Sequence, residues 1–314
     1  MISEEITRLQ TAKANIKTAI ENKGVEVSSS AKIDDYASLI DDISSGGDTS
    51  KYGNLIDNYS GSTVTNFNFY ALFEHLTIPS NIQTLWLNFP NYSQIKSISF
   101  EANSQCTSLP SQWFLNVTTL TNATLPPLIT IIPNQCFDNT RISTIDIPSG
   151  VTTINPYAFR QNPSLTTVNF QSNNTLTTIG ASAFDNCTNL SSITIPSSVT
   201  SIGNNAFQYC SSLTSIIIPS GVTTINAYAF QGCTSLTSID IPSGVTNIGD
   251  YAFQYCSSLS SVTVKAATPP TLGASAFNDT NNCPIYVPSE SVEAYKSASG
   301  WSNYASRIQP IPTV

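Results

Sequence analysis

The sequence predicts a repeat solenoid of short β-strands in 23-residue units, with a helical module before it and a helical cap after it. Three observations predict this fold class. Consecutive units begin at Ile193, Ile216 and Ile239 and keep the same apolar positions. Each unit contains an Ile-x-Ile-Pro segment or a close variant, and each contains one large aromatic residue after an alanine. A fixed period of this length is typical of chains in which every unit buries its apolar side on its neighbours.

Each position of the unit has a physical role. The two isoleucines of Ile-x-Ile-Pro alternate with one residue, so both point to the same side of a strand and the residue between them points outward. Proline ends the strand because it has no N–H to donate. We expect one ring in every unit to point into the core, namely Phe159, Phe184, Phe207, Phe230, Phe253 and Phe277.

Further copies of the unit extend the array in both directions. They begin at Ile145, Val168 and Val262, with weaker copies near Leu76, Ile98 and Ala123. In the weaker copies the Ala-Phe pair is replaced, in turn, by Leu87 and Phe89, by Phe114, and by Cys136 and Phe137. The predicted repeat region is therefore 76–284.

These elements together resemble the BspA-like, or Treponema-type, leucine-rich repeat family. The resemblance rests on the recurring Ile-x-Ile-Pro, Ile-Gly or Ile-Asn, Ala-Phe and Cys-x-x-Leu elements over residues 76–284. It implies a short-stranded, curved or twisted leucine-rich repeat solenoid with a binding role, often in surface adhesion.

Cysteines form a second regular pattern. Cys187, Cys210, Cys233 and Cys256 are 23 residues apart and occupy one position of the unit. Parallel Cβ vectors on stacked coils disfavour disulfides, and zinc ligation needs clustered Cys-x-x-Cys or His partners that are absent here. We interpret the column as small buried free thiols, and we expect no metal and no cofactor.

The segment 1–43 differs from the repeats because it holds 13 of the 32 charged residues. Apolar residues recur there at alternating spacings of four and three, which is a heptad seam. The seam residues are Ile2, Ile6, Leu9, Ile16 and Ile20. Either this helix oligomerises, with a trimer favoured by the isoleucines, or it packs on a second helical stretch at 34–43. Residues 44–75 are expected to form a linker and an N-terminal cap.

The same segment carries a second resemblance. Its residues EEITRLQTAKANIKTAIENKGVEV, followed by AKIDDYASLIDDI, are similar to the N-terminal module of many phage tail-fibre and virion-associated proteins. That resemblance implies attachment to other virion proteins through residues 1–43, with the far end of the chain meeting the host.

Residues 285–314 are predicted to form a C-terminal cap, which a solenoid needs because its last apolar face has no neighbour. Ser289 is expected to cap a helix, with Glu290 in the first turn. The side chains expected to cover the last repeat are Val292, Tyr295, Trp301, Tyr304 and Ile308.

Composition excludes several classes of function. A net charge of −8 and a pI near 4.5 argue against a nucleic-acid partner. No run of 18 apolar residues predicts a membrane span, and the N-terminus does not read as a secretory signal. A serine or cysteine catalyst would have to use the single histidine, His75, and Asp146 and Asp240 are four repeats apart, too far for a two-carboxylate mechanism. We therefore expect no enzyme activity.

Outward-facing residues are the candidates for binding. One column follows the strands: Asp146, Asn169, Thr194, Ile217, Asp240 and Thr263. A second column flanks the Ala-Phe pairs and holds Tyr157, Tyr209, Tyr228, Tyr251 and Tyr255. Tyrosine among Ser, Thr and Asn suits recognition of a host surface protein or a glycan. The tyrosines alternatively only cover the wall of the solenoid.

Three functions remain. The first is a phage virion protein, a tail or head fibre assembled in the host cytoplasm, since a reducing compartment suits free cysteines. The second is a bacterial cell-surface adhesin with the same repeats. A cytoplasmic hydrolase ranks last.

Overall fold

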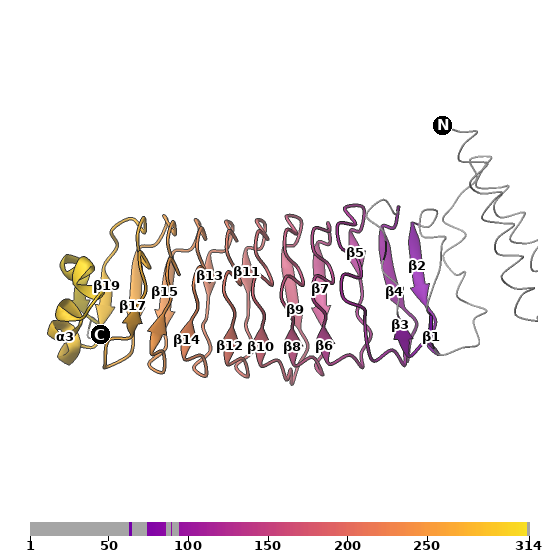
Figure 1. The fold of residues 1–314 in the computed structure, drawn as a ribbon, viewed down its shortest axis with the longest axis horizontal. Helices are drawn as coiled ribbons and strands as arrows, with labels where there is room; N and C mark the ends of the chain where they lie inside the picture. Colours follow the sequence, from indigo (N-terminus) through magenta and orange to yellow (C-terminus); the bar gives the residue numbers. More distant parts are fainter. Residues whose placement is uncertain (1–62, 65–73, 86–88, 90–93, 313–314) are drawn as a thin grey trace, which may run out of the picture.

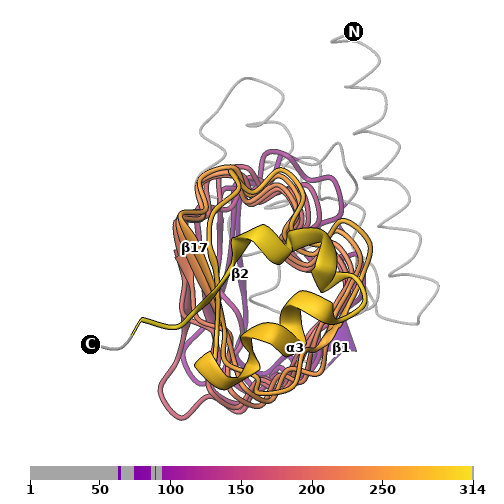
Figure 2. The same ribbon diagram turned by 90° about the vertical axis from the view of Figure 1, so that its left-hand side faces the viewer.

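The computed structural model describes residues 63–64, 74–85, 89 and 94–312, which form one row of stacked coils (Figure 1). Most coils pass through one strand ladder, turn, and pass through a second ladder on the other side, while the coil that begins at β4 (Ser97–Phe100) forms only a single bridge there, from Ser108 to Thr84. Figure 2 looks along the row and shows that successive coils superimpose with little drift. The described part of the chain is therefore the repeat solenoid that the sequence predicts.

The predicted N-terminal module lies outside the described residues. This applies to all of 1–43, including the seam residues Ile2, Ile6, Leu9, Ile16 and Ile20. The seam therefore stays a prediction.

The first strand ladder contains the Ile-x-Ile segments, and all its pairs are parallel. Its strands are β2 (His75–Ile78), β4 (Ser97–Phe100), β5 (Asn122–Ala123), β7 (Thr144–Ile147), β9 (Thr167–Phe170), β11 (Ser192–Ile193), β13 (Ser215–Ile216), β15 (Ser238–Ile241), β17 (Ser261–Val264), β19 (Ile285–Val287) and β20 (Ile308–Pro310). Within β15, Ile239 and Ile241 are buried and Asp240 is exposed, which confirms the predicted alternation.

The second strand ladder is also parallel and is made of two-residue strands. Its strands are β1 (Thr63–Val64), β3 (Thr84–Leu85), β6 (Ile131–Ile132), β8 (Thr153–Ile154), β10 (Thr178–Ile179), β12 (Ser201–Ile202), β14 (Thr224–Ile225), β16 (Asn247–Ile248) and β18 (Thr271–Leu272). Corresponding residues of successive units pair directly, as Ile179 does with Ile202, so the repeat period sets the register.

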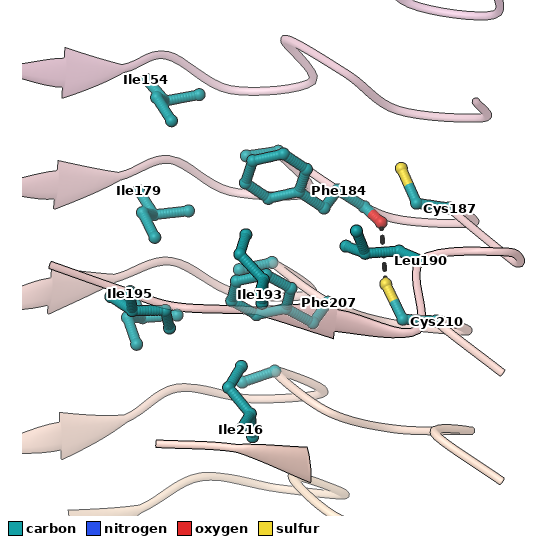
Figure 3. Packing of buried hydrophobic residues seen from close by; sticks show 14 of the residues in the cluster. Ile154, Ile179, Phe184, Cys187, Leu190, Ile193, Ile195, Phe207, Cys210 and Ile216 are labelled. Atoms are coloured by element: carbon teal, nitrogen blue, oxygen red, sulfur yellow. Dashed lines mark hydrogen bonds between the residues drawn. The ribbon is translucent and has the colours of Figure 1, made fainter. Parts of the chain in front are cut away.

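The core consists of columns of identical side chains, as Figure 3 shows for Ile154 and Ile179 and for Phe184 and Phe207. The phenylalanine rings from Phe114 to Phe277 stack with centroids 5.3–5.8 Å apart and interplanar angles of at most 16°. Phe89 extends the stack at 4.5 Å from Phe114. The predicted interior column is confirmed, and Phe114 and Phe137 occupy it in the irregular copies.

A helical cap closes the C-terminal end (Figures 1 and 2). It contains the 3-10 helix η2 (Ser289–Ser291), the helix α3 (Val292–Ser297) and the 3-10 helix η3 (Trp301–Arg307). Tyr295 and Trp301 are buried, and each donates a hydrogen bond to a backbone carbonyl of the 266–270 segment. The expectation for Ser289 is wrong. Ser289 is the first residue of the 3-10 helix η2, and the capping position belongs to Pro288, which has no side-chain acceptor. The Ser289 hydroxyl donates to the Glu290 carboxylate instead.

Candidate functional site

Between the second ladder and the next first-ladder strand lies a five-residue segment, such as 228–232, that we call the Ala-Phe turn. Its first and fifth residues have left-handed backbones, with φ of 59° at Tyr228 and 72° at Gly232. The N–H groups of the first, third and fifth residues donate to carbonyls of the following coil; Phe230, for example, donates to Ala252 at 2.9 Å. In the second ladder the direction is reversed, since the Gly249 N–H donates to Ile225 in the preceding coil. The stacked Ala-Phe turns form one side of the solenoid, which we call the turn wall. The backbone N–H groups of this wall therefore donate toward the C-terminal end of the chain.

The structure places the five candidate tyrosines at both ends of these turns. Tyr157, Tyr228 and Tyr251 occupy the first position, and Tyr209 and Tyr255 occupy the fifth. The predicted column that flanks the Ala-Phe pairs therefore divides into two. The tyrosines form two columns, one before and one after the buried Ala-Phe pair.

All five tyrosines have φ between 56° and 62°. A left-handed backbone costs a residue with a side chain about 1–2 kcal/mol. The bonds between coils maintain it: the Tyr228 N–H donates to Asp250 at 2.9 Å, and the Tyr209 N–H donates to Gln231 at 2.7 Å. The backbone that carries each ring is thus held by the next coil.

Two of the five rings stack on each other, and two others are exposed to solvent. Tyr228 and Tyr251 stack with centroids 5.0 Å apart at 15°. Tyr209 and Tyr255 are 42% and 48% exposed. Gly232, between these two in the fifth-position column, leaves room for the Tyr209 ring, since a Cβ there would lie 2.4 Å from its Cδ1. Together the two columns place half-buried and exposed tyrosine side chains along one side of the solenoid.

A column of polar side chains occupies the fourth position of the turns. Asp138 is fully buried and binds the guanidinium of Arg160 through both carboxylate oxygens, at 3.0 and 2.7 Å. Further along, Gln208 donates to Gln231, and Gln231 donates to Gln254 at 2.7 Å. These side-chain bonds connect neighbouring coils in addition to the backbone ladders. The repeat pattern of the sequence does not indicate them.

Asp185 stands between the ion pair and the glutamines in this column. Burial raises its pKa to about 6, although the nearby Arg160 and a hydrogen bond from Asn186 act in the opposite direction. The hydrogen bond to Asp138 raises the pKa of Arg160, so this guanidinium stays charged. Among the described residues of the turn wall, Asp185 is thus a carboxyl group that exchanges its proton near pH 6.

The column of outward strand residues is exposed from Asp146 to Asp240, as predicted, while Thr263 is half-buried. Ile217 is 78% exposed. Asn169 donates to Asp146 at 2.8 Å, and Lys265 pairs with Asp240 at 2.7 Å. The two carboxylates thus belong to separate pairs.

The thiol column is buried, which confirms that part of the prediction, and all seven cysteines are unbridged. Its members have a role that the sequence did not show. Cys210 Sγ donates to the carbonyl of Phe184 at 3.2 Å (Figure 3), and Cys187, Cys233 and Cys256 do the same one coil apart. Burial raises the pKa of Cys210 far above its usual value and that of Cys256 to about 12. These thiols stay protonated and act as hydrogen-bond donors.

His75 lies on the exposed face of β2 with its Nδ1 2.7 Å from the Ser97 hydroxyl. The neighbouring Glu74 carboxylate pairs with Lys96 at 2.7 Å. In the described ranges no group of three or more His, Cys, Asp or Glu side chains lies close enough to hold a metal. None of the helices that the structure describes is long and apolar enough to cross a bilayer.

Parallel two-to-four-residue strands, a ring column and a closed end together define a β-solenoid repeat protein. The family model described as "BspA type Leucine rich repeat region (6 copies)" matches residues 54–166 and 152–284. The chain therefore belongs to the BspA-type leucine-rich repeat family.

Several solved structures are similar to the chain. A leucine rich cell surface protein from Faecalibacterium prausnitzii is 22% identical with a TM-score of 0.43, over 80% of this chain and 87% of that one. A leucine-rich repeat protein from Bacteroides ovatus is 20% identical, also at 0.43, over 80% and 82%. The T. pallidum leucine rich repeat protein is 22% identical with a TM-score of 0.33, over 65% and 74%. None of the curated proteins compared with this chain matches it.

Proposed function

We propose that this chain is a non-enzymatic binding protein whose solenoid recognises a surface protein or a glycan through its two tyrosine columns. The observation that carries the proposal is the exposure of Tyr209 and Tyr255 beside the stacked Tyr228 and Tyr251, all on one rigid turn wall. Tyrosine supplies large contact area together with a polar hydroxyl.

The fixed backbone favours binding. A surface whose residues are already ordered loses little conformational entropy when a partner docks, whereas flexible loops must be ordered first. Here each tyrosine N–H is bonded to the next coil, as at Tyr255, whose N–H donates to Asn278 at 3.2 Å. Serine, threonine and asparagine around the rings add exposed hydrogen-bonding groups.

Two settings fit this role. In the first, the chain is a phage tail or head fibre that joins other virion proteins, and forms a homo-oligomer such as a trimer, through residues 1–43. The resemblance of this segment to virion-associated modules supports that setting. In the second, the chain is a bacterial cell-surface adhesin, which the binding role implied by its BspA-type repeats supports.

Binding is tested by replacing the tyrosines with the residue that the chain itself uses at the same positions. Asn205 and Asn186 occupy the first and fifth turn positions with φ of 58° and 59°. Tyr228→Asn with Tyr251→Asn, and separately Tyr209→Asn with Tyr255→Asn, therefore preserve the turn. We expect labelled protein to bind host cells or a glycan array at least tenfold more weakly. Ser220→Ala, at an exposed position outside both the tyrosine columns and the strand column, is the control. Unchanged binding in both tyrosine pairs contradicts the proposal.

The setting is tested separately by immunogold electron microscopy of the native source. Labelling of phage particles supports the fibre. Labelling of intact cells without particles contradicts it and supports the adhesin.

A further inference from the structure

The C-terminal end of the solenoid interrupts the hydrogen bonding of the turn wall. Each Ala-Phe turn from 112–116 to 251–255 donates three N–H groups to the next coil, but the last turn, 275–279, is followed by the helical cap (Figures 1 and 2). The cap supplies two hydrogen-bonding groups, one acceptor and one donor, that a following coil supplies elsewhere in the solenoid. The Tyr304 hydroxyl accepts from the Phe277 N–H at 3.3 Å, and Arg307 donates to the Phe277 carbonyl at 3.2 Å, where a column thiol donates in earlier coils.

The N–H groups at the first and fifth positions of this last turn, Ser275 and Asp279, gain no such replacement among the described residues. Asp279 has a left-handed backbone, with φ of 58°, like the fifth residue of each turn from 112–116 onward. In those turns the corresponding N–H, such as that of Tyr255, reaches a carbonyl of the next coil. The Asp279 N–H has no acceptor among the residues that the structure describes. It is a preoriented donor at the end of the wall.

Asp279 borders a cleft of about 650 Å³ between the last turn and the cap, which we call the end cleft. Pockets for small ligands commonly measure about 300–1,000 Å³. Phe277 and Pro284 are the apolar residues of its lining, and both are largely covered by the chain. The exposed part of the lining is polar and consists mainly of amides: Asn278, Asn282, Asn303 and Gln309.

The charges of the end cleft are balanced. The Arg307 guanidinium is engaged by the Phe277 and Cys283 carbonyls and the Thr280 hydroxyl, so it is held in place rather than free to clamp an anion. The Asp279 carboxylate supplies the opposite charge at the rim and would repel a second carboxylate or phosphate. The Asn278 side-chain oxygen accepts from the Tyr304 hydroxyl, which fixes that amide with its NH₂ group still available.

We infer that the end cleft binds a neutral saccharide, with a sugar oxygen accepting from the Asp279 N–H in the place of the missing coil. Amides both donate and accept, so they match hydroxyl groups, which do the same. The absence of an exposed apolar pocket in this lining disfavours a peptide, whose side chains need such pockets for specificity. This site is separate from the tyrosine columns and goes beyond the function proposed for them.

The test uses the full chain and neutral hexose and N-acetylhexosamine mono- and disaccharides as probes. Saturation-transfer NMR detects binding, and the ¹H–¹⁵N resonance of Asp279 reports its place. We expect a dissociation constant on the order of 1 mM for the best probe, and a shift of the Asp279 resonance. Asn282→Gly with Asn303→Ala removes two amides while glycine keeps the left-handed backbone, so we expect binding at least tenfold weaker. Asn204→Ala, which removes an exposed amide just before the turn 205–209, is the control.

Several outcomes overturn the inference. They are an absence of saturation transfer from every probe, a saccharide that binds without moving the Asp279 resonance, and unchanged binding by the double variant. A short blocked peptide of serine and glycine is run in parallel, and a shift caused by this peptide alone would assign the cleft to peptides. Because Tyr228→Asn with Tyr251→Asn leaves the end cleft intact, saccharide binding by that variant separates this inference from the tyrosine proposal.

Discussion

Replacement of Phe207 by alanine tests whether the ring column holds the coils together. The Phe207 side chain is completely buried, with the rings of Phe184 and Phe230 at 5.4 and 5.6 Å on either side. Truncation of a buried phenylalanine costs about 3–5 kcal/mol in all, and each ring pair accounts for about 0.5–1.5 kcal/mol of such a loss beyond its buried area. Since two ring pairs are lost at once, we expect a loss of unfolding free energy near the upper end, about 4–5 kcal/mol.

The loss is measured by urea unfolding followed by far-ultraviolet circular dichroism, at a single protein concentration. Tyr209→Asn is the control, because it removes an aromatic side chain from the same turn but from an exposed position, and we expect a change below about 1 kcal/mol. If Phe207→Ala lowers the free energy of unfolding by less than about 2 kcal/mol, or by no more than the control does, the ring column does not stabilise the solenoid as its stacking implies.

Three further perturbations probe the turn wall and the thiols. Gly232→Ala should cost about 1–2 kcal/mol by urea unfolding, because φ is 72° and the new Cβ meets the Tyr209 ring; an unchanged midpoint contradicts this. Ellman's reagent at pH 8 should label Cys210 and the other buried thiols only after denaturation, and rapid labelling of the native chain would refute their burial. Burial raises the pKa of Asp185 from 3.8 to about 6, so the folded state binds more protons than the unfolded state and stability falls as pH rises from about 4 to 6. Asp185→Asn should therefore be more stable than the parent at pH 8 by about 1 kcal/mol, a figure reduced for partial exposure, and equal to it near pH 4; a constant difference across this range would contradict the assignment.

The repeat itself was predictable because each buried position recurs with the same residue type. The period places Phe184, Phe207 and Phe230 in register without any structural information, and the alternation in Ile-x-Ile separates buried from exposed residues. The irregular copies followed the same rule, since Phe114 and Phe137 occupy the ring column even though Trp113 and Cys136 replace the alanine.

The turn wall was not predictable in the same way. Bulky residues rarely adopt positive φ, so nothing in the local sequence at Tyr209 or Tyr251 indicates it. The conformation is imposed by hydrogen bonds to the next coil, which are contacts over more than twenty residues. The same is true of the thiol bonds of Cys210 and of the end cleft, whose donor at Asp279 is defined by the fold of the cap rather than by any motif.

The N–H groups of the turn wall donate to the following coil, whereas those of the second ladder donate to the preceding coil, and this arrangement has an evolutionary consequence. Because a coil receives and offers the same set of bonds at its two ends, unequal recombination between the near-identical units at Ile193, Ile216 and Ile239 can add or delete a whole unit without creating a mismatched junction. The length of the rod, and with it the number of tyrosines available to a multivalent target, can thus change in single genetic steps while the terminal structures stay as they are.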